Sequence, residues 1–490
     1  MINEKRKVII IGSGVAGLAA SIRLAHLGFE VCVYEQQSTY GGKMGEWVSQ
    51  GYRFDTGPSL FTMPQYVEDL LLIDNKNDVD FSYQKLDIVC KYFWQDGTNL
   101  TAFSDIAKLA AEFEQNLSEP KKNIFSALEK SKQKFTITNH VFLEKSLHRI
   151  STYLNLATLR SVFMLPKINV FTKMHRQNKL LFKNPKTVQF FDRYATYNGS
   201  NPYKAPATLN VIPHYEFGFG AYAPINGIRS IADCLYKKAL GLGVEFRFNS
   251  PILSAVKTHN EYILNGSETS DILVCNMDVA AAALGPLSSI LSTKKTKYEP
   301  SSSALIFYWG INRSFKELDI HNIFFTDDYK KEFDSLFDDK KIAEDPTVYI
   351  NITSKNNKSD APDGCENWFV MVNAPYVANQ NWDEMIEKAK SNILKKLSKL
   401  LSCDINKHIV VEEKLTPILI RNNTSSHKGA LYGSSSNHLM SAFLRQPNFS
   451  TKHKGLYFCG GSVHPGGGIP LSLLSAKIMT DKIKYDYRIY

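Results

Sequence analysis

The chain reads Val8-Ile9-Ile10-Ile11-Gly12-Ser13-Gly14-Val15-Ala16-Gly17 close to its N-terminus. The four apolar residues at the start of this stretch predict a buried parallel strand. A helical pattern follows, with Val15, Leu18, Ala19 and Ile22 on one face and Gly28 at its end. A second strand then runs through Val31 and Val33 to Glu35. The order strand, helix, strand around G-x-G-x-x-G predicts a nucleotide-binding unit.

Each glycine of the motif has a separate expected role. Gly12 permits the tight turn, Gly14 lets the backbone approach a pyrophosphate, and Gly17 lets the helix lie close to the strand. The helix begins at Val15 and Ala16, where free N–H groups and the positive end of the helix dipole favour phosphate. We therefore expect these five residues to form one half of a dinucleotide site.

An acidic residue ends the second predicted strand. Glu35 stands eighteen residues after Gly17, where a carboxylate can accept hydrogen bonds from both ribose hydroxyls. The same carboxylate would repel a 2′-phosphate, and the adjacent Gln36 is a further candidate contact. At this point the choice between NAD and FAD is open.

The segment after Glu35 favours FAD. It contains Gly41-Gly42-Lys43-Met44 and, further on, Gly57-Pro58-Ser59. Taken alone, the paired glycines could be a plain turn. Together, these stretches resemble the GG motif of the amine-oxidase and carotenoid-desaturase group of flavoproteins. The resemblance implies that Gly42 and Lys43 lie near the pyrophosphate and that residues 57–59 pass the flavin ring. Lys43 stands where the family more often has Arg, so the charge is kept and the bidentate fork is lost.

The C-terminal end of the chain predicts the other half of the site. A strand over 456–459 leads into Gly460-Gly461-Ser462-Val463-His464-Pro465-Gly466-Gly467-Gly468-Ile469-Pro470, and a helix follows from Leu471 to about Ile483. Glycines let the backbone run against a flat ligand, and a proline suits the first turn of a helix. The segment resembles the C-terminal FAD signature of bacterial carotenoid desaturases. That resemblance implies contacts from Gly461, Gly468 and Ile469, with His464 shaping the loop rather than acting as an acid or base.

The chain as a whole is predicted to be an α/β protein with a Rossmann-like FAD-binding domain and an inserted α+β substrate lobe. We expect residues 1–100, 222–288 and 430–490 to form the discontinuous FAD domain, and residues 101–221 and 289–429 to form the lobe. Residues 252–256 are predicted to form a strand. In related flavoproteins the position matching Ile252 contacts the adenine, and the turn matching Asn276 lies near the cofactor.

Residues 191–206, beginning Phe191-Asp192-Arg193-Tyr194, are similar to a stretch typical of the bacterial phytoene-desaturase family. The stretch from Gly57 to Pro64 resembles its 1-hydroxycarotenoid 3,4-desaturase branch. The resemblance implies hydride removal from an allylic carbon of a hydrophobic carotenoid onto flavin N5, with a double bond formed between C3 and C4. The alternatives are a phytoene desaturase, an amine oxidase of the same fold, and a non-enzymatic prenyl-lipid carrier.

No catalytic residue can be named from the sequence. It contains no Ser/His/Asp set, no paired carboxylates and no metal-binding cluster that stands out. Arg193, Tyr197 and His214 are expected to be structural. Because no second strand–G-x-G-x-x-G–helix unit follows, we expect the electrons to pass to a quinone or oxygen rather than to a nicotinamide.

The net charge of +10 is concentrated in one segment. Residues 121–186 hold fourteen Lys or Arg against two acidic residues. Nucleic acid is one partner that such a patch could bind, but we favour an anionic membrane surface, because a carotenoid must be drawn from a bilayer. We therefore predict a basic helical membrane-contacting region over 121–187, in a cytoplasmic protein associated peripherally with the inner face of the membrane. Its apolar members are Phe125, Leu128, Phe135, Val141, Phe142, Leu147, Leu154, Leu156, Val162, Phe163, Met164, Leu165 and Phe171. Seven scattered cysteines fit a reducing compartment.

Overall fold

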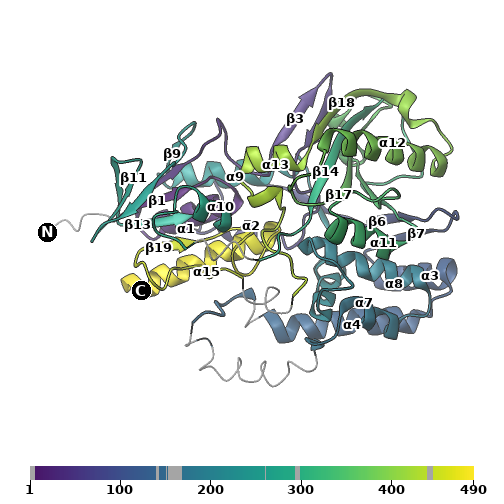
Figure 1. Ribbon diagram of the computed structural model, residues 1–490, viewed down its shortest axis with the longest axis horizontal. Helices are drawn as coiled ribbons and strands as arrows, with labels where there is room; N and C mark the ends of the chain where they lie inside the picture. Colours follow the sequence, from purple (N-terminus) through teal and green to yellow (C-terminus); the bar gives the residue numbers. More distant parts are fainter. Residues whose placement is uncertain are drawn as a thin grey trace.

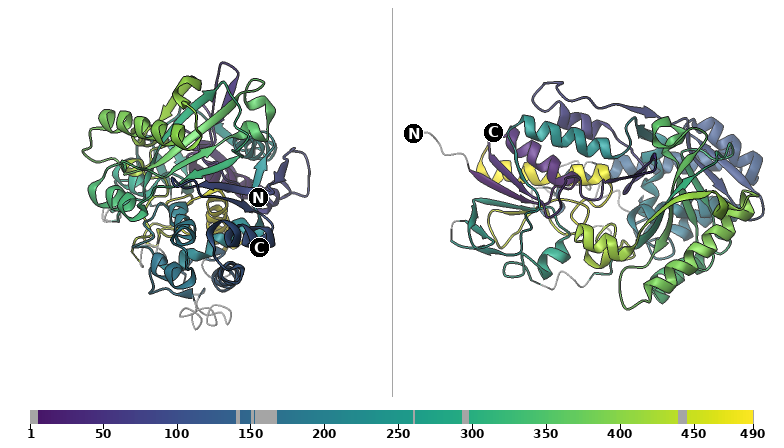
Figure 2. Two further views of the ribbon diagram at one scale, coloured as in Figure 1. Left: turned by 90° about the vertical axis from the view of Figure 1, so that its right-hand side faces the viewer. Right: turned by 90° about the horizontal axis from the view of Figure 1, so that it is seen from above.

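Two β-sheets organise the protein, one toward each end of an elongated molecule (Figure 1). The structure is a computed structural model that describes residues 6–139, 143–149, 152, 168–259, 261–292, 298–438 and 445–489. A parallel sheet lies at the end where both chain termini are found, and a larger mixed sheet lies at the other end (Figures 1 and 2).

The first sheet has five parallel strands in the order β19-β13-β1-β2-β9. Its register places Ile10 beside Val33 on one side and Val274 on the other. The strands come from distant parts of the chain: β1 (Lys7–Ile11), β2 (Glu30–Tyr34), β9 (Glu245–Arg247), β13 (Ile272–Cys275) and β19 (Leu456–Phe458). All three segments predicted for the FAD domain therefore contribute strands, although the division into domains stays a prediction.

The two faces of this sheet pack against different layers, because side chains alternate along a strand. Val8 and Ile10 of β1 pack toward helices, and Ile9 and Ile11 pack toward the opposite layer. The helical layer consists of α1 (Val15–His26), α2 (Gln65–Leu71), α9 (Arg229–Gly241) and α15 (Ile469–Tyr487). The opposite layer holds α10 (Val279–Leu284) and a three-stranded sheet of β10 (Ala255–Lys257), β11 (Tyr262–Leu264) and β12 (Glu268–Ser270).

Two predicted element boundaries differ from the structure. The sequence predicts a strand from Ile252, but β10 begins at Ala255, because the N–H groups of Leu253 and Ser254 donate to the side chain of Asn265 instead of to a strand. The last helix begins at Ile469 rather than Leu471 and continues to Tyr487. Its early start fits Pro470, which needs no N–H partner in a first turn.

The second sheet has seven strands in the order β18-β14-β17-β16-β15-β6-β7. Along its central strand, Leu305, Phe307 and Trp309 pack toward α12 (Trp382–Leu400), and Ala304, Ile306 and Tyr308 point to the other face. Its strands are β6 (Ile88–Phe93), β7 (Asn99–Phe103), β14 (Ser303–Ile311), β15 (His321–Phe324), β16 (Val348–Asn351), β17 (Glu366–Ala374) and β18 (Ile409–Leu415). Two short antiparallel two-stranded sheets are also present: β3 (Glu46–Ser49) with β4 (Tyr52–Asp55), and β5 (Tyr83–Lys85) with β8 (Tyr222–Pro224).

A group of helices lies below the mixed sheet in the view of Figure 1. They are α3 (Ile106–Leu117), α4 (Lys121–Thr138), α7 (Met174–Leu181) and α8 (Pro185–Asp192), followed by short helical turns at 193–198, 207–211 and 215–219. The other α-helices among the described residues are α11 (Tyr329–Asp334) and α13 (Pro417–Thr424). Within the described part of the chain, no helix is long and apolar enough to cross a bilayer.

The predicted membrane-contacting region is described only in part. Among its apolar residues, Val141, Phe142, Leu154, Leu156 and 162–165 lie outside the described residues. Phe125 and Phe171 are exposed, as the prediction requires. Leu128 and Leu147 are buried and belong to the interior instead.

Candidate active site

One cavity of about 1260 Å³ extends from the parallel sheet to the mixed sheet and is lined by residues from both ends of the chain. This volume exceeds the roughly 300–1,000 Å³ of most single-ligand pockets. Sixteen of the seventeen predicted cofactor contacts line it: Gly12, Gly14, Val15, Ala16, Glu35, Gln36, Gly42, Lys43, Gly57, Pro58, Ser59, Ile252, Asn276, Gly461, Gly468 and Ile469. The seventeenth, Gly17, is buried and is not among the lining residues.

The turn between β1 and α1 is shaped by its glycines. Gly12 has φ +96°, a conformation that side chains disfavour. A Cβ on Gly17 would lie 2.1 Å from the carbonyl oxygen of Gly12, so the helix could not approach the strand as closely. A Cβ on Gly14 would lie 3.0 Å from the side-chain nitrogen of Asn276, and one on Gly42 would lie 3.1 Å from the Cα of Gly14. Three separate segments therefore meet closely at these glycines.

Glu35 comes directly after β2, lies beside this turn and is buried. Its Oε2 accepts hydrogen bonds from the N–H and the hydroxyl of Ser13, and its Oε1 accepts one from the N–H of Gln37. A carboxylate oxygen can accept two hydrogen bonds, so Oε1 retains capacity for a further donor. Because Glu35 also lines the cavity, that capacity is available to a ribose hydroxyl.

The segment from Gly41 to Ser59 forms a second wall of the cavity. A Cβ on Gly57 would lie 1.7 Å from the carbonyl oxygen of Lys43, so only glycine fits at position 57. The Lys43 ammonium group donates to the carbonyl oxygen of Leu431 at 2.8 Å. The surrounding protein desolvates this group and lowers the pKa of Lys43 to about 8. A phosphate placed near it would add negative charge and favour the charged ammonium form.

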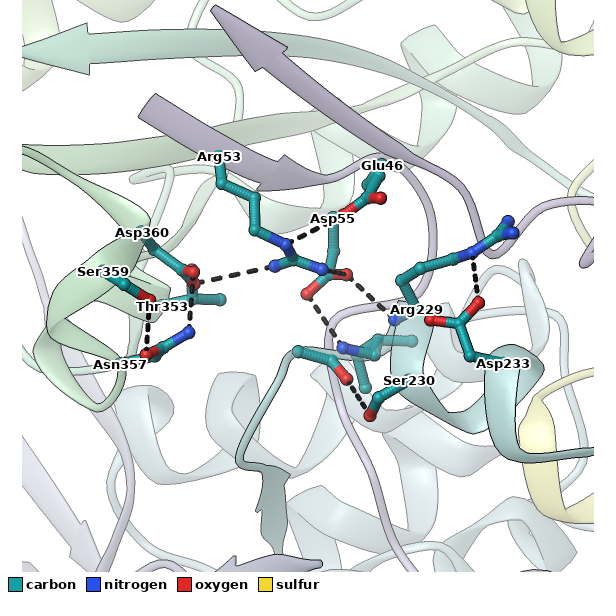
Figure 3. Close-up of polar contacts among 12 residues, drawn as sticks. Glu46, Arg53, Asp55, Arg229, Ser230, Asp233, Thr353, Asn357, Ser359 and Asp360 are labelled. Carbon is teal, nitrogen blue, oxygen red and sulfur yellow. Dashed lines mark hydrogen bonds and ion pairs between the residues drawn. The ribbon is translucent and has the colours of Figure 1, made fainter. Parts of the chain in front are cut away.

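An ionic cluster holds this second wall in position (Figure 3). Both carboxylate oxygens of Asp55 accept N–H groups at the start of α9, from Ile228 and Arg229, at 2.9 and 3.0 Å. The guanidinium group of Arg229 donates to the carbonyl oxygens of Tyr40 and Met44, on either side of Gly41-Gly42-Lys43. Arg229 and Asp55 are therefore positioning residues, which the sequence analysis did not single out.

The loop before α15 forms the third wall. Gly468 has φ +100°, and a Cβ there would meet no atom within 4 Å, so this backbone is open toward the cavity. The buried His464 ring bonds through Nε2 to the carbonyl oxygen of Lys145 at 2.9 Å. Burial lowers the pKa of His464 to about 4, which leaves the ring neutral and makes Nε2–H the donor. This geometry favours a loop-shaping role for His464.

The two remaining predicted contacts lie at the middle of the chain. Asn276 follows β13, and its side-chain nitrogen donates to the carbonyl oxygen of Gly12 at 3.2 Å. This bond joins the ends of two adjacent parallel strands, where ligands bind in open α/β sheets. Ile252 is buried on the cavity wall next to Pro251 and Leu253.

The part of the cavity beyond these glycine-rich loops is mostly apolar. One side is the face of the mixed sheet that carries Ile306, Tyr308 and Met371. The other side comes from the short helical turns after α8, with Leu209 and Ile212. A long hydrophobic molecule could lie between these two surfaces while the first part of the cavity holds a nucleotide.

A buried polar cluster interrupts the apolar wall. Arg193 donates to Tyr197 at 3.1 Å and to Glu216 at 3.4 Å, and the hydroxyl of Tyr194 donates to Glu216 at 2.6 Å. Arg193, Tyr197 and Glu216 line the cavity, whereas His214, the third polar residue considered from the sequence, is not among the lining residues. The His214 ring packs on Phe135 instead.

A second polar group was missed by the sequence analysis. Ser59, Tyr349 and His321 form a hydrogen-bonded chain on the same wall, from the loop that follows Gly57 to strand β15. Only Ser59 stood in a motif. His321 and Tyr349 come from two strands whose pairing brings them together, and no local pattern marks either residue.

Comparisons with known proteins agree with this arrangement. The family described as "Flavin containing amine oxidoreductase" matches residues 15–483. The chain belongs to this family. It is 47% identical, over 98% of its length and 99% of the relative's, to a protein named 1-hydroxycarotenoid 3,4-desaturase from Flavobacterium sp. (strain P99-3). It is 31% identical, over 99% of both chains, to a 4,4′-diapolycopene oxygenase from Methylomonas sp..

Solved structures of low identity share the fold. Cyclohexylamine oxidase from Brevibacterium oxydans IH-35A matches with a TM-score of 0.64 at 13% identity, over 99% of this chain and all of that chain. Wild-type putrescine oxidase matches with the same TM-score and identity over 99% of both chains. The predicted α/β fold with a Rossmann-like FAD-binding domain is therefore confirmed. The predicted membership of the carotenoid desaturase family is confirmed as well.

The predicted FAD cofactor is likewise confirmed by the family, and the residues present fit it. Gly14, Gly42 and Gly57 let neighbouring segments pack closely along the cavity wall where a Cβ would meet protein atoms, and Glu35 keeps one acceptor for a ribose. Which individual residues contact the cofactor stays a prediction.

Proposed function

We propose that this protein is an FAD-dependent desaturase that introduces the C3–C4 double bond into a 1-hydroxylated carotenoid. The observation that carries the proposal is the 47% identity, over almost the whole of both chains, to a relative named for that reaction. An apolar cavity that continues from the glycine-rich loops to the mixed sheet supports it. An amine oxidase would need to hold a cation, and a lipid carrier would have no use for the cofactor site.

The residues of the chain have separable tasks in this reaction. We infer that the turn at Gly12–Ala16 and Lys43 hold the pyrophosphate, Glu35 holds the ribose, and the segments 57–59 and 461–469 flank the flavin. FAD, when bound, accepts the hydride that leaves the allylic carbon. The apolar surfaces around Leu209 and Ile306 exclude water and orient the polyene.

The proposal assigns no general base. A positive charge developing beside a conjugated polyene is delocalised, and the neighbouring C–H then becomes acidic enough for a weak acceptor. The buried carboxylate on this wall, that of Glu216, is already bonded to Tyr194, Tyr197 and Arg193. The electrons would leave to a quinone or to oxygen.

The test is turnover by the purified FAD-loaded protein in the presence of a quinone or oxygen. The substrates are 1-hydroxylated acyclic and monocyclic carotenoids and phytoene. We expect the hydroxylated substrates to give products that absorb to the red and that mass spectrometry shows to have lost two hydrogens. Conversion of phytoene to lycopene without any red shift of the hydroxylated substrates would place the protein in another branch of the family. A gain of oxygen would indicate the activity named for the Methylomonas relative.

We also propose that the protein binds peripherally to the cytoplasmic face of the membrane through α4 and α7. These helices lie next to each other on the lower surface in Figure 1. Phe171 is 89% exposed and Leu180 is 73% exposed, and Lys173, Lys179 and Lys183 are exposed beside them. Apolar side chains among lysines suit the boundary between headgroups and acyl chains.

A further inference from the structure

The wall of the substrate cavity contains three side chains joined by hydrogen bonds. The proposed function gives this chain as a whole no role. The hydroxyls of Ser59 and Tyr349 lie 2.8 Å apart, and the Tyr349 hydroxyl lies 2.8 Å from Nδ1 of His321. All three residues line the cavity. Tyr349 and His321 are on the paired strands β16 and β15, and Ser59 comes directly after Gly57-Pro58.

The neighbours of His321 determine which of its nitrogens carries the proton. The side-chain nitrogen of Asn351 lies 3.2 Å from Nδ1 of His321 and also donates to the carbonyl oxygen of Ile320 at 3.0 Å. Only the NH₂ group of an amide can donate to a carbonyl, so the orientation of Asn351 is fixed. Because that NH₂ group faces Nδ1, Nδ1 is an acceptor. A neutral ring then has its proton on Nε2.

The ring is neutral at physiological pH. Burial lowers the pKa of His321 to about 3, and the positive charge of Arg193 lowers it further in the same direction. His321 is only 4% exposed. Its Nε2–H is a buried donor that has no acceptor among the residues that the structure describes. An unpaired buried donor costs about 1–3 kcal/mol, so an acceptor is expected to arrive from outside the chain.

We propose that Nε2–H of His321 donates to the tertiary hydroxyl of the substrate and makes His321 the residue that selects hydroxylated ends. The inference rests on the proposed function. The hydroxyl is on C1, three bonds from C4, so its binding group must lie close to the reacting carbon. The Ser59–Tyr349–His321 chain meets this condition, because it starts at the segment proposed to pass the flavin and spans only two hydrogen bonds and one imidazole ring.

A substrate without the hydroxyl would leave this donor buried and unpaired. Sites built to bond a substrate hydroxyl reject the analogue that lacks it far more strongly than apolar pockets distinguish one methylene group. The nearby Arg193 donates through its two terminal NH₂ groups to Tyr197 and Glu216, but its Nε–H is also a buried donor without an acceptor among the described residues. His321 differs from Arg193 because its unpaired donor belongs to a neutral ring. Selectivity then comes from one neutral hydrogen bond.

The experiment compares kcat/KM for two substrates with the same polyene, one with and one without the 1-hydroxyl group, using FAD-loaded protein. Wild type should favour the hydroxylated substrate by at least about a hundredfold. His321→Leu should lower kcat/KM for that substrate by about ten- to a hundredfold, and should leave the analogue unchanged or improved. His321→Gln places an amide N–H near the position of Nε2 and should restore part of the preference. His408→Gln, in a turn beside β18, is the matched control and should change neither value.

A binding measurement separates recognition from chemistry and from folding. Reduced enzyme, which cannot accept a hydride, should bind the hydroxylated carotenoid more tightly than the analogue, and this difference should shrink in His321→Leu. FAD content and melting temperature show whether each variant is folded. Equal affinities for the two carotenoids in reduced wild type would overturn the assignment even if no variant folded.

The outcomes also distinguish this inference from the proposed function. If wild type desaturates both carotenoids equally well, the protein is a desaturase and His321 does not recognise the hydroxyl. If a buried water occupies the site instead, His321→Leu will leave the preference of wild type intact, and the inference also fails. If no carotenoid is converted or bound, the proposed function itself fails.

Discussion

Ser13 gives both of its donors, the backbone N–H and the side-chain hydroxyl, to Oε2 of Glu35, at 2.8 and 2.7 Å. The turn that faces the pyrophosphate and the carboxylate proposed to hold the ribose are therefore one hydrogen-bonded unit. Gln37 adds a third donor to Oε1. The acid at the end of the second strand thus has a structural task in addition to its proposed contact with the cofactor.

Replacing Glu35 with Gln should weaken FAD binding for two reasons. The ribose loses a charge-assisted acceptor, worth about 1.5–3 kcal/mol. In either orientation, the new NH₂ group also faces an existing donor, from Ser13 or from Gln37. We expect the Kd for FAD to rise by about ten- to a hundredfold in titrations followed by flavin fluorescence. Glu30→Gln, an exposed position at the start of the same strand, is the control. Unchanged retention in Glu35→Gln would remove Glu35 from the site.

Replacing Gly57 with Ala should prevent the loop from closing on Lys43. The new Cβ would lie 1.7 Å from a backbone carbonyl oxygen, and a backbone atom cannot rotate away as a side chain can. We expect loss of bound FAD and a free energy of unfolding lower by more than about 2 kcal/mol, which is typical of steric strain in a core. The control is Gly241→Ala at the end of α9, where a Cβ meets nothing within 4 Å. Wild-type flavin content in Gly57→Ala would contradict the geometry.

The cofactor half of the site could be predicted from sequence because its determinants are local. A glycine that must admit a pyrophosphate or a flat ring is required at a fixed distance from a strand end, so Gly12, Gly14 and Gly468 stand out in the chain itself. The same holds for Glu35, at the end of a strand with an apolar run. These residues come together because parallel strands place their carboxyl ends at one edge of the sheet.

The substrate half could not be predicted in this way. His321 and Tyr349 meet only because β15 pairs with β16. The sequence of neither strand specifies the register of that pairing. Arg229 acts on the loop around Gly41 across 188 residues of chain. The lysines around Leu128 in the sequence led to the prediction that this residue faces the membrane. In the structure Leu128 is buried on the inward side of α4. Tertiary packing decides these positions.

Lowering the pH should destabilise the protein through His464. Its pKa is about 4 in the folded state and near 6.5 when unfolded, so its contribution to stability is complete above pH 6.5 and is lost as the pH falls toward 4. At pH 5 the loss amounts to about 2 kcal/mol. Urea unfolding at pH 7.5 and pH 5 should show this difference in wild type and a smaller one in His464→Gln, which keeps a donor for Lys145. An equal loss in both proteins would mean that His464 is not buried and neutral.

Reversing two charges, at Lys179 on α7 and at Lys183 two residues beyond its end, should weaken membrane binding if this surface is the one that meets the lipid. Each Lys or Arg near an anionic membrane contributes about 1 kcal/mol, so Lys179→Glu with Lys183→Glu should reduce the partition coefficient by at least about thirtyfold. The matched control is Lys395→Glu with Lys399→Glu, which has the same spacing and charge on α12, on the opposite side of the molecule in Figure 1.

Flotation with phosphatidylglycerol vesicles measures the effect. Rising salt should weaken the binding of wild type toward the level of the α7 variant, because exposed charges are screened. Neutral phosphatidylcholine vesicles should show little difference between the variants. Equal losses from α7 and α12 would indicate that net charge, rather than this surface, governs binding.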